Sequence, residues 1–278
     1  MPAHRHFISY KIELKKRMLS TLHRFRILTV LAIAALSLDT GSVHAVENAY
    51  RVEIEAGAVW QSLNDAQSPA VTTTTLPQGS RFSLKNLQGS GPERFGRLSA
   101  GYTWGDRHQI HALYAPLTIA GTGAFSTPVH FQGATFTANV ATAGRYKFDS
   151  YRIGYRYKLL GKSQWKIWSG ATIKVRDANI SLAQGPVEVN YADTGVVPLL
   201  SLYARRDLSD RWSTILDLEG LAAPQGRAID AVFKVRYQFG DIIGLNAGYR
   251  MLEGGADNRK VYTFAWLHYG LVSLDDGF

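Results

Sequence analysis

The sequence predicts an all-β fold, an antiparallel transmembrane β-barrel of about ten strands with short periplasmic turns and longer extracellular loops. Three observations lead to this prediction. The N-terminus has the pattern of an export signal, and the rest of the chain alternates apolar and polar residues in segments about as long as a membrane-crossing strand. Tight turns also alternate with longer connections along the chain, as in outer-membrane barrels.

The N-terminal segment reads RFRILTVLAIAALSLDTGSVHA over residues 24–45. Two arginines precede an apolar run over residues 27–38, and small residues follow, which is typical of a secretory signal peptide. At about 1.5 Å per residue, a helix of about twelve residues is too short for a hydrocarbon core of about 30 Å. We predict a signal peptide over residues 1–45 with cleavage after Ala45, with Met18 as an alternative start of translation. The alternative is a soluble amphipathic helix.

Composition limits the possible partners. Residues 1–45 hold 7 of the 31 Lys and Arg and 2 of the 22 Asp and Glu, which leaves 24 basic and 20 acidic residues. No basic cluster with interleaved aromatics is present, so we expect no nucleic-acid partner. The chain has no Cys, which excludes disulfides and thiolate metal sites. The predicted mature chain, residues 46–278, is long enough for one domain and has no second apolar run long enough for a transmembrane helix.

Alternation is clearest in DSYRIGYRYKLLG, residues 149–161, where apolar residues interleave with Ser, Arg, Gly and Lys. Successive side chains of a strand point to opposite faces, so this segment predicts a strand between an apolar medium and a polar one. The same pattern predicts about ten strands. They span residues 49–62, 93–104, 107–119, 146–160, 164–179, 195–206, 211–222, 227–239, 242–252 and 259–273.

The connections between these strands alternate in length. Residues 63–92 and 120–145 are predicted as long loops, and residues 180–194 as a loop of intermediate length. The tight turns fall at residues 105–106, 161–163, 207–210 and 240–241. An even number of strands with turns on one side would return both ends of the barrel to the periplasm.

The apolar faces could meet lipid, or they could pack on one another in a periplasmic sandwich or a soluble barrel. Two observations favour lipid: the placement of the aromatic residues, and the length of several strands, about ten residues between turns, which matches the roughly nine to eleven needed to cross a bilayer at a tilt. Aromatic residues lie near strand ends on the apolar faces, as expected for the two membrane interfaces. They are Tyr50, Trp60, Tyr102, Trp104, Tyr157, Trp165, Trp212, Tyr237 and Phe239. A lipid-facing Arg or Lys at the bilayer midplane costs about 2–4 kcal/mol, so Arg152 and Arg156 are predicted to face inward.

Three segments of the second half resemble an uncharacterised group of Gram-negative outer-membrane β-barrel proteins. They are KVRDANISLAQG (174–185), VPLLSLYARRDLSDRWSTILDLEGLAAPQGRAID (197–230) and GYRMLEGGADNRKVYTFAWLHYG (248–270). The resemblance implies the barrel fold and an outer-membrane location, and it brings no assigned catalytic residue.

Barrels of this group commonly end in an aromatic residue after an alternating strand. Phe278 meets the first condition, but Asp275 and Asp276 interrupt the second. Whether residues 274–278 belong to the last strand is open at this point.

The inward positions are rich in charges of both signs, and they define a predicted lumen charge network. Its members are Glu53, Glu55, Arg152, Arg156, Arg205, Asp217, Glu219, Asp230, Lys234, Arg236 and Arg250, with Lys174 and Arg176 also facing inward. A barrel of about ten strands is close to the eight-stranded size that side chains fill, so a wide porin is not expected. We predict that the charges pair across the lumen and largely close it. The alternative is a narrow channel for small solutes or ions.

Enzymatic chemistry has weak support in the sequence. A hydrolase or lipid-modifying enzyme needs a base beside a nucleophile, and the predicted mature chain has four His. His108 and His268 are predicted away from the extracellular rim, with His268 a hydrogen-bonded histidine of the lumen toward the periplasmic half. His130 lies in a long loop near Ser126 and Thr127, without a neighbour to orient it. We assign no catalytic residue, no cofactor and no metal site.

A third possibility is a surface role for the loops at residues 63–92 and 120–145, because long loops are common places for binding. The expected surroundings are outer-membrane lipid and lipopolysaccharide, with the barrel assembly machinery as a partner during biogenesis. We expect a monomer.

Overall fold

The computed structural model describes residues 49–161, 164–240 and 242–277. The predicted signal peptide and its cleavage site after Ala45 lie outside the described residues, as does Phe278. Within the described residues, no helix is long and apolar enough to cross a membrane.

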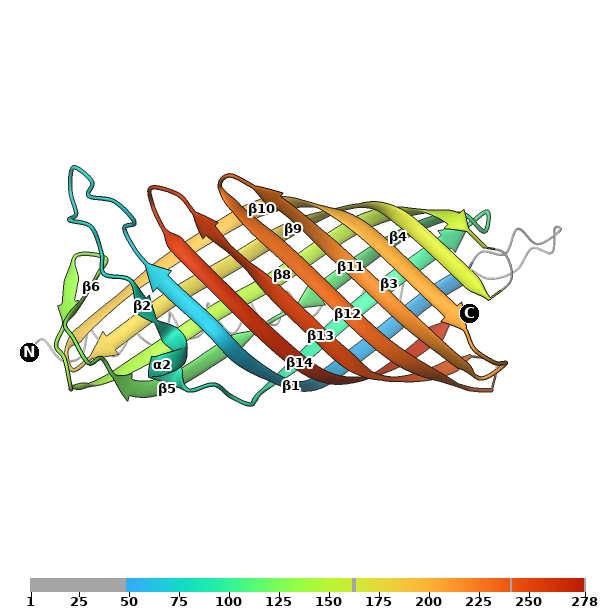
Figure 1. Ribbon diagram of the computed structural model, residues 1–278, viewed down its shortest axis with the longest axis horizontal. Coiled ribbons are helices and arrows are strands. Elements are labelled where there is room, and N and C mark those ends of the chain that lie inside the picture. The colour runs from blue at the N-terminus through green and yellow to red at the C-terminus, as the bar shows by residue number, and fades with distance from the viewer. Residues whose placement is uncertain (1–48, 162–163, 241, 278) are drawn as a thin grey trace, which may run out of the picture. The chain divides into compact units, whose positions relative to one another are not determined.

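The described chain is a closed antiparallel β-barrel of ten strands, as the alternation predicted (Figure 1). Each strand pairs with the next in sequence order, and the last strand pairs with the first to close the barrel. The barrel strands are β1 (Ala49–Gln67), β3 (Glu93–Trp104), β4 (His108–Ala115) continued by β5 (Thr118–Ala124), β8 (Ala141–Leu160), β9 (Trp165–Gln184), β10 (Val187–Asp207), β11 (Trp212–Ala223), β12 (Gly226–Phe239), β13 (Ile243–Asp257) and β14 (Tyr262–Gly277). Closure pairs every strand with a neighbour on each side over at least part of its length, which is the condition for a β structure in lipid.

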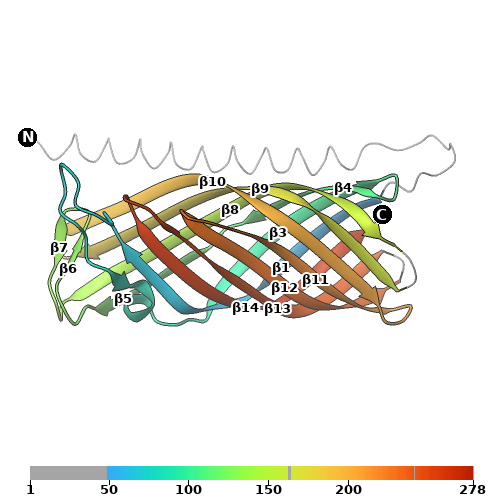
Figure 2. The ribbon, with the colours of Figure 1, turned by 45° about the horizontal axis from the view of Figure 1, so that its top comes forward.

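The two ends of the barrel differ. The turn end carries the tight connections β3–β4, β8–β9, β10–β11 and β12–β13, together with the first residues of β1 and the last of β14 (Figure 1). The loop end carries β2 (Phe82–Ser83), α2 (Leu84–Gln88), β6 (Val129–Phe131) and β7 (Ala134–Phe136) within its two long connections. Figure 2 shows β5, β6 and β7 gathered at this loop end.

Two boundary predictions need correction. Residues 180–194 are not a loop, because β9 and β10 continue through them and only residues 185 and 186 form the turn. The prediction failed because this hairpin extends past the apolar region, so that polar residues such as Asn179 and Asn190 occupy its outer face. Residues 274–277 belong to β14, since Leu274 pairs with Ile54 and Leu245.

The barrel wall is incomplete along β10. This strand pairs with β9 over almost its whole length, but it pairs with β11 only between Leu200 and Asp207. Beyond Leu200 toward the loop end, β10 has a partner on one side only. Pro198 lies in this half-paired part, where a residue that lacks an N–H donor is tolerated.

The loop end is covered by an apolar cap, formed by β2, α2 and the β6–β7 hairpin. Phe82 contacts Phe125 and Phe131 edge to face, with ring centroids 5.5 and 5.4 Å apart. Phe131 and Phe136 are fully buried. Ser83 caps α2 by accepting a hydrogen bond from the Asn86 N–H. The first long loop is therefore a packed structure over the mouth of the barrel.

Glycines of the barrel wall make room for this cap. A Cβ at Gly121 or Gly123 of β5 would lie 2.6 Å from a backbone oxygen of α2. A Cβ at Gly144 of β8 would lie 2.6 Å from the Leu87 side chain. A larger residue at Gly121 or Gly123 would displace the backbone of α2, and one at Gly144 would require the Leu87 side chain to move.

An apolar belt surrounds the outside of the barrel. Residues such as Ile54, Ile153 and Leu200 point outward and are more than 60% exposed. In β8 the outward apolar residues run from Tyr151 to Leu159, about the nine residues that a tilted strand needs to cross a bilayer.

Aromatic residues border the belt at both ends. At the turn end, Trp104 stacks on Tyr102 and on His108, with centroids 5.9 and 5.3 Å apart. At the loop end, Tyr114 stacks on Tyr151 at 5.1 Å. These are the positions of the two aromatic girdles of a transmembrane barrel.

Beyond the loop-end girdle the outer face becomes polar. Lys147 of β8 bonds Asp177 of β9, and this hydrogen bond raises the pKa of Lys147. Lys147 also lies 3.3 Å from Asp149. The strands β8, β9 and β10 therefore extend past the apolar belt into a polar medium.

Phe131→Ala should loosen the cap without opening the barrel. Loss of a buried Phe side chain costs about 3–5 kcal/mol, and here the loss falls on the cap alone. We expect faster protease cleavage within residues 68–92 and 125–140, with the strands still resistant. Equal cleavage rates in the variant and the unaltered protein would contradict the packed cap.

Candidate functional site: a lumen divided by ion pairs

The lumen contains two cavities that meet at a layer of charge. The turn-end cavity has a volume of about 520 Å³ and the loop-end cavity about 480 Å³. Three residues line both of them, Arg152 of β8, Glu219 of β11 and Asp230 of β12. These three residues form the partition between the cavities.

Arg152 extends from β8 across the lumen and bonds both carboxylates of the partition, which belong to β11 and β12. Its guanidinium donates to Glu219 Oε2 at 2.6 Å and to Asp230 Oδ2 at 2.7 Å. The side chain of Arg152 is 2% exposed. Charge-assisted bonds of this length between buried groups are among the strong interactions of a protein interior.

Asp230 is the acceptor on which most of these bonds converge. Besides Arg152, it accepts from Arg250 at 2.6 Å and from Arg97 at 3.2 Å. Arg250 also donates to Glu55 at 2.9 Å. One carboxylate thus joins three arginines from β3, β8 and β13.

Glu219 has a second set of partners. Thr172 donates to its Oε1 at 2.7 Å, and His111 Nε2 lies 3.2 Å from the same oxygen. Arg156 lies 3.5 Å from Glu219 and donates to Asp217 at 2.6 Å.

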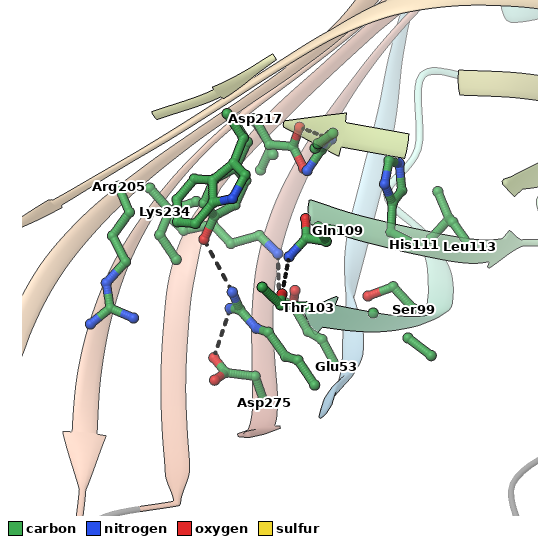
Figure 3. A pocket seen from close by; sticks show the side chains of 18 of the residues that line it. Glu53, Ser99, Thr103, Gln109, His111, Leu113, Arg205, Asp217, Lys234 and Asp275 are labelled. Carbon is green, nitrogen blue, oxygen red and sulfur yellow. Dashed lines mark hydrogen bonds and ion pairs between the residues drawn. The ribbon is translucent and has the colours of Figure 1, made fainter. Parts of the chain in front are cut away.

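Toward the turn end, the ion pairs continue along the wall of the larger cavity (Figure 3). Lys234 bonds Glu53 and lies 2.9 Å from Glu55. Arg236 lies 2.7 Å from Asp275, which also accepts a hydrogen bond of 2.7 Å from Asn246. The cavity wall is therefore a polar and paired surface.

The structure places all eleven residues of the predicted lumen charge network on the inner face and gives each an ionic partner. Ten of them join the pairs described above. Arg205 lies apart, near the turn end, where it donates to Asp207 at 2.6 Å.

Sequence analysis missed four members of the network, Arg51, Arg97, His111 and Asp275. Arg51 and Arg97 occupy polar positions of correctly predicted strands, so the alternation alone could have found them. Asp275 was missed because it appeared to break the last strand. It lies inward, 3.3 Å from Arg51, on the polar side of β14.

The loop-end cavity is mainly apolar. Tyr146, Ile180, Leu199 and Leu252 contribute to its walls and are buried. Its other polar groups, besides the partition, include Lys174 and Arg176 of β9, Asp193 of β10 and Arg227 of β12.

The prediction for His268 was wrong in two respects. The residue faces outward, because β14 turns Ala265, Leu267 and Tyr269 to the interior, where they are buried. Its neighbour on the outer face is Trp266, so it lies at the loop-end girdle rather than toward the turn end. Both faces of this strand are apolar, which left its orientation ambiguous in the sequence.

His268 joins a polar cluster on the outer face. Its Nε2 lies 3.0 Å from Ser62 Oγ, and its Nδ1 is hydrogen-bonded to the Tyr249 hydroxyl. Ser62 is the extra residue of a β-bulge between Gln61 and Leu63 in β1. Bulges redirect side chains, and here the bulge brings a serine beside a histidine on the next strand. No motif in the sequence indicated this contact.

The remaining histidines have structural neighbours. His130 of β6 lies 2.9 Å from the Thr135 hydroxyl. His108 is hydrogen-bonded to Tyr155 at 2.8 Å within the turn-end girdle. In the described part of the chain, no group of three or more His, Asp or Glu is arranged to hold a metal ion.

No protein-family model and no curated protein matches the chain. Solved structures match it at low identity. The outer membrane protease OmpT from Escherichia coli has a TM-score of 0.49 at 9% identity, over 86% of this chain and 99% of that one. The translocator domain of the autotransporter NalP from Neisseria meningitidis has a TM-score of 0.37 at 11% identity, over 92% and 96%. Ail, the attachment invasion locus protein of Yersinia pestis, has a TM-score of 0.35 at 8% identity, over 82% and 98%.

The geometry of the chain itself defines the class. A closed ring of ten antiparallel strands, an apolar outer belt and a charged interior are the features of a transmembrane β-barrel of the outer-membrane type.

Asp230→Asn should destabilise the barrel strongly. Removal of one partner from a buried ion pair costs about 3–5 kcal/mol, and here three buried arginines each lose the carboxylate that they share. Urea unfolding of the refolded protein in lipid vesicles measures this loss. The matched control is Asp106→Asn, which removes an exposed partner of Lys158 and should cost less than about 1 kcal/mol. Equal costs for the two variants would show that the partition does not hold the barrel together.

Proposed function

We propose that the chain is an integral barrel of the outer membrane of a Gram-negative bacterium, with a lumen closed by its own charges. In this arrangement the turn end faces the periplasm and the loop end faces the outside. The observation that carries the proposal is the partition of Arg152, Glu219 and Asp230, because its members bond directly to one another between the two cavities. The barrel is then structural or interacts through its surface.

The predicted surroundings fit this orientation. The apolar belt would lie in outer-membrane lipid, and the polar extension of β8, β9 and β10 would lie among lipopolysaccharide head groups. The export signal predicted before Val46 would deliver the chain to the periplasm, and the barrel assembly machinery would insert it. We propose a monomer, because one chain closes the ring by itself through the pairing of β14 with β1.

The folded cap supports a surface role for the loop end. Its exposed side includes the threonine run at residues 72–75, held by hydrogen bonds such as that from Leu76 N–H to Thr73 Oγ1 at 2.9 Å. A packed loop presents a fixed surface, which lowers the entropy lost when a partner binds.

Planar-bilayer recording tests the closed lumen. The unaltered protein should insert without conductance steps, whereas a variant with Arg152, Glu219 and Asp230 all changed to Ser and the cap loosened by Phe131→Ala should conduct, because both the partition and the cap over the mouth are then weakened. Asp217→Ala and Arg236→Ala, outside the partition, should stay silent. Discrete steps from the unaltered protein whose size changes in these two controls would support the narrow channel and overturn the proposal.

A lipid-modifying enzyme is the second candidate function, and the Ser62–His268 contact favours it. Ser62 Oγ would attack the carbonyl carbon of a lipid ester while His268 Nε2 takes the hydroxyl proton. The alcohol would leave with that proton, and an acyl group would remain on Ser62. Water, giving its proton to His268, would then release the fatty acid and restore Ser62. Tyr249 would hold the imidazole in place.

A fluorophosphonate probe tests this second candidate in vesicles that contain lipopolysaccharide and phospholipid. Labelling should fall on Ser62 and disappear in His268→Asn, and fatty acid release should stop in Ser62→Ala. His108 offers the matched control, because its ring is also hydrogen-bonded to a tyrosine, Tyr155, but contacts no serine among the described residues. His108→Asn should change neither readout. Absence of both labelling and release in the unaltered protein would reject the enzyme.

A further inference from the structure

The loop-end cavity reaches the outside through the side of the barrel. Its walls include both faces of β10, with the inward Leu199 and the outward Val196, which is 68% exposed. On the other side its walls include the β11–β12 hairpin from Leu221 to Ile229. These are the two segments between which backbone pairing is missing. Because both faces of β10 line the cavity where β10 has no pairing with β11, the cavity opens to the outside of the barrel between β10 and the β11–β12 hairpin.

The opening lies beside lipid. Val196 and Leu200 on β10 and Leu221 and Ile229 on the hairpin are exposed apolar residues of the outer belt. Above them, Arg227 pairs with Glu253 at 2.6 Å, which marks the polar level of the loop end. The opening therefore faces the outer border of the apolar belt.

One cation in the cavity lacks a counter-charge. Among the described residues, every other Lys or Arg that lines either cavity has a carboxylate within ion-pairing distance. Lys174 has none, although it is only 4% exposed. Its ammonium lies 4.7 Å from the centroid of the Phe148 ring, also in the cavity wall. A buried ammonium without a partner is costly, so an anion bound beside Lys174 would stabilise its charged form.

A second donor lies next to it on the same strand face. Arg176 follows Lys174 by two residues in β9, so both side chains point inward. The guanidinium of Arg176 bonds Asp193 through one terminal nitrogen, while its buried Nε has no hydrogen-bond partner. Lys174 and this Nε are therefore two unused donors within one apolar cavity.

We propose that the loop-end cavity binds an amphipathic monoanion, a carboxylate with a long hydrocarbon tail, which enters from the membrane between β10 and the β11–β12 hairpin. The carboxylate pairs with Lys174 and Arg176. The tail lies against Tyr146, Ile180 and Leu252 and leads toward the side opening. A cavity of about 480 Å³ with mainly apolar walls and few polar groups is typical of a small-molecule site. The cap covers the cavity from the loop end, so the ligand is exchanged with lipid.

Binding of palmitate to the full barrel in a neutral detergent tests the proposal, with isothermal titration as the readout. The unaltered protein should bind one palmitate, and Lys174→Met should weaken binding by about tenfold or more, because a charge-assisted bond is lost. Lys158→Met is the matched control, since Lys158 lines the other cavity and pairs with Asp106. This control should bind as the unaltered protein does.

Three further ligands and one further variant separate the contribution of the carboxylate to the affinity from that of the hydrocarbon tail. Hexadecanol has the tail without the charge and should bind at least about tenfold more weakly than palmitate. Acetate and inorganic phosphate lack the tail and should not compete with palmitate at equal concentration. Ala178→Trp, which places a large side chain in the cavity wall, should abolish palmitate binding while the circular dichroism of the barrel is unchanged.

Equal palmitate affinity in the unaltered protein and Lys174→Met would overturn the proposal, as would competition by phosphate alone, which would indicate a small-anion site. Absence of palmitate binding to the unaltered protein would also overturn it. None of these results bears on the closed lumen, because the partition residues are intact in every variant used.

Discussion

The convergence of three arginines on one carboxylate, Asp230, is the interaction on which the rest of the lumen depends. The arginines come from β3, β8 and β13, so a single side chain of β12 connects its neighbour β13 with β3 and β8, with which β12 has no backbone pairing. Lipid outside the barrel forbids these charges on the outer face, and the small ring forces them together inside. The pairing then satisfies charges that would otherwise be buried alone.

Local alternation made the fold predictable. In β12 every second residue from Ile229 to Phe239 is apolar, and each faces outward, so strand and orientation both followed from the pattern. β14 has apolar residues on both faces, and the orientation of His268 could not be read from it. The extension of β9 and β10 was missed because hydrophobicity marks only the part of a strand that lies in the apolar belt, whereas backbone pairing continues beyond it.

The candidate sites were less predictable, because they depend on which strands face each other across the ring. The inward position of Arg152 followed from alternation, but its contacts with Glu219 and Asp230 depend on the closure of the barrel. Lys174 looked in the sequence like any other inward cation. Its lack of a carboxylate is a property of the folded interior, as is the contact of Ser62 with His268 across a bulge. Both candidate sites lie at an interruption of a regular arrangement. Among the described residues, Lys174 lacks the ion pair that the other inward cations have, and Ser62 is the extra residue of a β-bulge.

The glycines under the cap have a consequence for the order in which the molecule assembles. The surface that receives α2 consists of Gly121 and Gly123 on β5 and Gly144 on β8, so it exists only after these two strands have paired. Residues 68–92 precede both strands in the chain, so they can pack only after β5 and β8, which follow them, have paired. The packing of α2 over the mouth of the barrel is therefore a late step of folding, which follows the pairing of β5 with β8.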